Sequence, residues 1–181
     1  MSSKYNHIDK KDIKMDIIKI FVTSLAMISI SSVTVLADTP EPSNNIDYPV
    51  GWQKWSPIAV SHRTDNNTSR VILGNSIAVE AARTGKINPW PDGAILGKIV
   101  WKDKQLKDWK AATGPGEFVH AEFMFKDSKK YNKTYGWGWA RWVGLSQKPF
   151  NDGGQSCIAC HTPVKNRDWV FTDPAVFPSL K

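Results

Sequence analysis

The chain has 181 residues and a formal net charge of +7, from 24 lysines and arginines against 17 aspartates and glutamates. The basic residues form no clustered stripe of the kind that a phosphate backbone needs. The charge therefore favours general solubility and argues against nucleic acid as a partner. The only two cysteines lie close together near the C-terminus, which leaves none for a disulfide framework.

Residues 1–37 have the pattern of a secretory signal peptide. Five lysines precede the apolar stretch Ile20–Leu36, and acceptable cleavage residues end at Ala37. The 17 residues of the apolar stretch fall short of the ~20 that a membrane-spanning helix needs. We therefore expect cleavage after Ala37 and export to the periplasm. Translation could start at Met1 or at Met15, because the segment from Met15 is itself a complete signal peptide.

One folded domain is expected after this leader. Residues 39–46 are rich in proline, serine and asparagine, so we interpret residues 38–47 as a linker. The remaining residues, 48–181, are enough for a single domain with one hydrophobic core.

Strands dominate the predicted secondary structure of this domain. Four runs alternate with period two and are rich in β-branched and aromatic residues, which predicts strands. These runs are Ser69–Gly74, Ala94–Trp101, Phe118–Lys126 and Tyr135–Val143. We predict an α+β fold, predominantly β, with an open or barrel-like antiparallel sheet and a few short helices.

The helical segments are fewer and shorter. One helix is well defined over Ser76–Thr84, with Asn75 as its N-cap and Gly85 as its C-terminal residue. A second helix is possible over Tyr48–Trp55. The segment Trp101–Trp109 fits either a helix or a strand.

Cys157–His161 reads C-I-A-C-H, the attachment signature of a c-type haem. Its two cysteines form thioether bonds to the haem, and its histidine binds the iron. A thioredoxin-like redox pair would not require His161, and a zinc site would need a second pair of cysteines. We expect one covalent haem c per chain, held by Cys157, Cys160 and His161, with the motif opening a short helical turn. The antiparallel sheet is then expected to pack on this C-terminal c-type haem. Its C-terminal position in a strand-rich domain disfavours both the small all-helical cytochromes and the four-helix cytochromes c′.

The sixth position on the iron has three candidate ligands, His62, His120 and Met124. On the predicted strand Phe118–Lys126, period two places Glu122 on one face with His120 and Met124. Val119, Ala121, Phe123 and Phe125 then form the core face. If Met124 or His120 binds the iron, the protein is a six-coordinate electron carrier. If Glu122 instead overhangs an open site, substrates can bind beside an acid or base.

Several short motifs occur in a fixed order along the domain. They are Arg70 ahead of the Ser76–Thr84 helix, Pro91-Asp92-Gly93 followed by Lys98, Glu122 ahead of Lys126-Asp127, Gly136-Trp137-Gly138, and Cys157–His161 followed by Asp168-Trp169-Val170-Phe171-Thr172. With these motifs in this order, residues 48–177 resemble the cytochrome P-460 family.

The resemblance implies a β-rich homodimer with a five-coordinate haem on each subunit. In catalytic members a lysine amine is joined to a meso carbon of the porphyrin, and Lys98 matches that lysine. Glu122 matches the distal carboxylate, and Arg70 matches a basic residue on the same side. The implied activity is oxidation of hydroxylamine to nitric oxide or nitrous oxide, with electrons passed to a soluble cytochrome acceptor.

Related cytochrome c′-beta proteins share this fold but lack the cross-link and have an apolar distal cap, which fits nitric oxide binding without catalysis. Lys98 together with Glu122 favours the enzyme. The ability of Glu122 to accept protons would depend on its pKa, which partial burial raises and a nearby Arg70 lowers.

Overall fold

The computed structural model describes residues 39–176. The expected signal peptide, residues 1–37, lies outside these residues. Within them, no helix is both long enough and apolar enough to cross a membrane.

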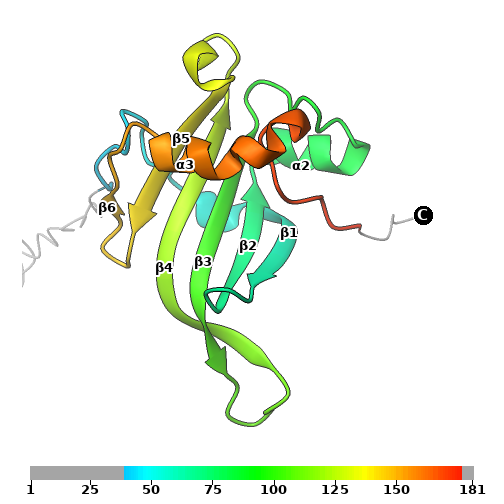
Figure 1. The fold of residues 1–181 in the computed structure, drawn as a ribbon, viewed down its shortest axis with the longest axis vertical. Helices are drawn as coiled ribbons and strands as arrows, with labels where there is room; N and C mark the ends of the chain where they lie inside the picture. Colours follow the sequence, from blue (N-terminus) through cyan, green and yellow to red (C-terminus); the bar gives the residue numbers. More distant parts are fainter. Residues whose placement is uncertain (1–38, 177–181) are drawn as a thin grey trace, which may run out of the picture. The chain divides into compact units, whose positions relative to one another are not determined.

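A six-stranded antiparallel sheet forms the body of this part of the chain, and each strand pairs with the next one along the sequence (Figure 1). The strands are β1 (Ser56–Arg63), β2 (Thr68–Gly74), β3 (Ile95–Gln105), β4 (Thr113–Lys126), β5 (Trp137–Val143) and β6 (Lys148–Pro149). The helices are α2 (Ser76–Thr84) and α3 (Gln155–His161), with 3-10 turns η1 (Trp52–Lys54), η2 (Asn132–Thr134) and η3 (Thr162–Arg167). The predicted α+β, mainly β class is confirmed.

All four predicted strands are present as β2 to β5, but two strands, β1 and the short β6, were missed. In β1 a register shift between Pro57 and Ala59 buries the neighbouring residues Ile58 and Ala59, so the strand does not alternate. The ambiguous segment after Trp101 continues β3 as far as Gln105.

The possible helix over Tyr48–Trp55 is wrong. Only the single turn η1 forms, because Gly51 takes a left-handed conformation with φ 83° directly before it. The predicted helix Ser76–Thr84 is confirmed as α2. The Asn75 side chain accepts a hydrogen bond from the Ala78 amide, and Gly85 ends the helix at φ 70°.

The two faces of the sheet pack against different parts of the chain. One face carries Phe123 and Trp142 and is covered by the N-terminal segment that includes η1 (Figure 1). The other face packs against α2 and α3, with Ala78 and Cys157 in the shared apolar cluster. As predicted, Ala121 and Phe123 lie in the first core, with Glu122 and Met124 on the opposite face.

Residues 39–47, the described part of the expected linker at 38–47, pack against the sheet. Ser43 is fully buried; its hydroxyl donates to the Phe150 carbonyl at 2.9 Å and accepts from the Arg141 amide at 3.1 Å. The Trp142 indole donates to a backbone carbonyl of the same stretch at 2.8 Å. Small polar residues such as those of this stretch are typical of a linker. Here, however, the stretch forms hydrogen bonds with buried polar groups of β5 and with the Phe150 carbonyl. This stretch is therefore part of the folded domain.

Candidate functional site

A cavity of about 700 Å³ lies between α3 and the sheet, within the usual ~300–1,000 Å³ of cofactor sites. Its walls come from β1 to β5, from α3 and from the chain that follows η3. All six site residues predicted from the sequence line it: Arg70, Lys98, Glu122, Cys157, Cys160 and His161.

Helix α3 presents the C-x-x-C-H motif to the cavity. Gly153 and Gly154 precede the helix in left-handed conformations, with φ of 68° and 78°. A Cβ atom at Gly154 would lie 3.0 Å from the Cβ of Trp139, so glycine lets α3 approach β5 closely. Cys157 is buried and Cys160 is exposed.

His161 is held in one tautomer. Its Nδ1 lies 2.6 Å from the backbone carbonyl oxygen of Trp169, and a carbonyl only accepts, so Nδ1 carries the proton. The ring lies edge-on to Trp139 and Phe171, with 5.0 Å between ring centroids in each pair. Burial lowers the pKa of His161 and favours the neutral ring. Its Nε2 is therefore left with a lone pair for a metal.

Glu122 lies at the centre of a charge cluster built by cross-strand pairing. Lys98 on β3 and Arg141 on β5 are its direct partners across the ladder. Lys98 Nζ forms an ion pair with Oε2, and Arg141 Nε lies 2.5 Å from Oε1. Burial alone would raise the pKa of Glu122, but Lys98 foremost, then His120 and Arg141, outweigh it and lower the pKa to about 2. Glu122 is thus a carboxylate at neutral pH.

The family model described as cytochrome P460 matches residues 49–172, well over half of the chain. The chain belongs to the cytochrome P460 family. Membership implies a haem cofactor and iron. A comparison with curated proteins found no match.

The residues of the cavity fit the haem that cytochrome P460 membership implies. The motif residues Cys157, Cys160 and His161 line the same cavity, and the Nδ1 hydrogen bond of His161 leaves Nε2 available to iron. Arg70 Nε, on β2, is buried without a hydrogen-bond partner among the described residues. An anionic group such as a haem propionate would satisfy this orphaned donor.

The three candidate sixth ligands differ in their surroundings in this cytochrome P460 member. Met124 and His62 line the cavity, and His62 Nε2 lies 2.5 Å from Asp103 Oδ2. His120 points to the same charge cluster, with Nε2 3.5 Å from Glu122 Oε1. Burial lowers the pKa of His120 to about 4, so its ring is neutral at neutral pH.

Sequence reasoning missed two parts of the site. Arg141 is the single cation in a strand of mostly aromatic and small residues, and this position could have marked it as a site residue. Its pairing with Glu122 depends on the register between β4 and β5. The carbonyl that holds His161 comes from the backbone of Trp169, which leaves no side-chain signature.

Proposed function

We propose that this cytochrome P460 member is a periplasmic mono-haem c-type cytochrome that oxidises hydroxylamine to nitric oxide or nitrous oxide. One observation carries the proposal. Lys98 and Glu122 are paired in the same cavity that contains the C-x-x-C-H cysteines and histidine. The cavity therefore combines an amine, a carboxylate and a metal-binding imidazole.

The chain's own residues would hold the cofactor from several elements. Cys157 and Cys160 would form thioether bonds, and His161 Nε2 would bind the iron. Lys98 would add a bond from its amine to the macrocycle. That bond replaces one N–H and one C–H, so its formation requires an external oxidant. When bound, haem supplies an iron that binds hydroxylamine and accepts its electrons.

Glu122 and Arg70 supply the polar chemistry on the open face. An anionic Glu122 retains the polar substrate and can accept protons released during its oxidation. With a pKa of about 2, the carboxylate is a weak base while Lys98 remains an ammonium. Bonding Lys98 to the macrocycle removes that positive charge, which raises the pKa of Glu122 toward a range suited to proton transfer.

A second candidate function is nitric oxide binding without catalysis, as in cytochrome c′-beta proteins. The apolar side chains of Ile72 and Leu96 support it, because they line the cavity beside the Lys98–Glu122 pair and those nitric oxide-binding proteins have an apolar distal cap.

Spectra and masses of the purified haem protein separate these candidates. A peptide that retains a Lys98–haem bond, with a red-shifted ferrous Soret band and hydroxylamine-dependent reduction of an acceptor, supports the enzyme. An ordinary five-coordinate high-spin spectrum without the adduct supports nitric oxide binding. A low-spin six-coordinate spectrum overturns both and indicates an electron carrier with Met124 or His120 on the iron.

Localisation and partners complete the proposal. The signal-peptide pattern of residues 1–37 supports export and cleavage after Ala37, and c-type haem is attached on the outer side of the inner membrane. We further propose a homodimer that passes electrons to a soluble cytochrome. Sedimentation of the haem protein tests the dimer, and stopped-flow reduction of added cytochromes tests the acceptor.

A further inference from the structure

A buried ion pair between Lys126 and Asp168 lies next to the backbone carbonyl of Trp169, which accepts the hydrogen bond from His161. We propose that Lys126 and Asp168 are positioning residues: they fix the Trp169 carbonyl that accepts the His161 Nδ1–H bond, and so set how strongly this histidine donates to iron. This inference rests on the part of the proposed function in which His161 binds haem iron. It is independent of the substrate.

The backbone that carries this carbonyl has an unfavourable conformation. Asp168 and Trp169 are consecutive non-glycine residues with φ of 49° and 67°, in the left-handed region that L-residues avoid. Such a turn persists only where its surroundings hold it. The turn places the Trp169 carbonyl 2.6 Å from His161 Nδ1.

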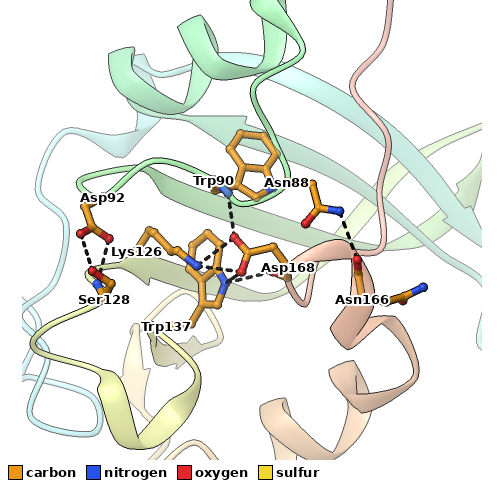
Figure 2. A network of polar contacts seen from close by, with 8 residues as sticks. All are labelled: Asn88, Trp90, Asp92, Lys126, Ser128, Trp137, Asn166 and Asp168. Carbon is orange, nitrogen blue, oxygen red and sulfur yellow. Dashed lines mark hydrogen bonds and ion pairs between the residues drawn. The ribbon is translucent and has the colours of Figure 1, made fainter.

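Three separate segments of the chain donate hydrogen bonds to Asp168 (Figure 2). Lys126 Nζ, at the end of β4, donates to its two carboxylate oxygens at 2.7 and 2.8 Å. The Trp90 amide, in the loop after α2, donates to Oδ2 at 2.8 Å. The Trp137 indole, on β5, donates to the Asp168 backbone carbonyl at 2.9 Å and lies 3.3 Å from Oδ1.

The pair is shielded from water. The side chains of Lys126 and Asp168 are 8% and 10% exposed, and Lys126 Nζ also lies 4.8 Å from the centre of the Trp137 ring. Burial increases the attraction between the two charges. Losing one partner would be costly, because the remaining charge would be buried and unpaired. Strand β4 also carries Glu122, which lines the cavity. One strand therefore contains both the carboxylate of the site and the lysine that pairs with Asp168.

The consequence for the metal follows from the hydrogen bond. A firm Nδ1–H···O=C bond fixes the imidazole ring and raises the basicity of Nε2, which strengthens the bond to iron and favours the ferric state. Loosening the Asp168 turn weakens that hydrogen bond. The iron–histidine bond should then weaken and the reduction potential rise.

The test is Asp168→Asn in the haem protein, which keeps the side-chain shape and removes the charge. We expect the ferrous iron–histidine stretching band in resonance Raman spectra to move to lower frequency and broaden, and the reduction potential to become more positive. Asp92→Asn is the matched control. The Asp92 carboxylate accepts bonds from the Ser128 amide and hydroxyl at 2.8 and 2.6 Å, in the same region but without contact to Asp168 (Figure 2). This control should leave both readouts unchanged.

Trp137→Phe provides a second variant if Asp168→Asn fails to fold, because it keeps an aromatic ring while it removes the indole donor together with part of the buried ring. A smaller shift in the same direction is expected. Wild-type band and potential in the variants that fold, with only a lower melting temperature, would overturn the proposal. If the wild-type protein does not oxidise hydroxylamine, the proposed function alone is overturned, because the shift of the iron–histidine stretching band does not depend on the substrate.

Discussion

Glu122 is the residue on which the proposed chemistry of the cavity depends. Its side chain is 13% exposed, and its carboxylate forms ion pairs with Lys98 and Arg141. We predict that Glu122→Gln lowers the turnover of hydroxylamine by about 10²–10⁴-fold, the usual contribution of a positioned acid or base. Haem content, measured from the absorbance of the denatured protein, should not change.

The control for this prediction lies on the same strand. Glu117 is exposed on β4 and does not line the cavity, so Glu117→Gln should retain full turnover. Equal turnover in Glu122→Gln and Glu117→Gln would remove Glu122 from the reaction.

The depressed pKa of Glu122 also predicts how stability depends on pH. The folded pKa is about 2 against an ordinary value of 4.5, so the folded state favours the carboxylate. The resulting stabilisation is present above pH 4.5 and is lost as the pH falls toward about 2. While Lys98 keeps its charge, the difference in melting temperature between wild type and Glu122→Gln should shrink over this interval. A difference that stays constant from pH 5 down to about pH 2 would contradict the assignment.

At the scale of elements, the approach of α3 to β5 determines where the cysteines of the C-x-x-C-H motif lie. Gly153→Ala and Gly154→Ala share the cost of a left-handed alanine, roughly 1–2 kcal/mol. Only at Gly154 does the new methyl group also approach Trp139, at 3.0 Å, whereas a Cβ at Gly153 has nothing within 4 Å. We predict that Gly154→Ala is the more destabilising change by roughly 1 kcal/mol or more and attaches less haem. Equal denaturation midpoints and haem yields for the two variants would show that this contact is unimportant.

At the scale of the whole molecule, residues 39–46 complete the folded domain. Ile46 is 7% exposed, and Ser43 satisfies backbone groups at Phe150 and Arg141. A chain that begins at Asp47 should therefore unfold at a lower urea concentration than one that begins at Asp38, because it exposes apolar surface and leaves buried polar groups without partners. Identical midpoints would restore the interpretation of residues 38–47 as a linker.

Local patterns explain why much of the fold was predictable. Alternation in β4 placed Glu122 and Met124 on the face opposite Ala121 and Phe123, because side-chain direction in a strand depends only on its own residues. The same reasoning failed in β1, where the shift after Pro57 breaks the alternation. It failed again before η1, where the left-handed Gly51 prevents the longer helix.

The sequence by itself determined the kind of site: C-x-x-C-H specifies haem chemistry, and the ordered motifs around Lys98 and Glu122 specify the family. The tertiary structure alone decided how these residues act on one another. Register across three strands surrounds Glu122 with Lys98 and Arg141 and lowers its pKa. A left-handed turn at Asp168 and Trp169, which Lys126 of β4 contacts, selects the tautomer of His161. Both effects depend on distances between segments remote in the chain, and local sequence patterns do not encode those distances.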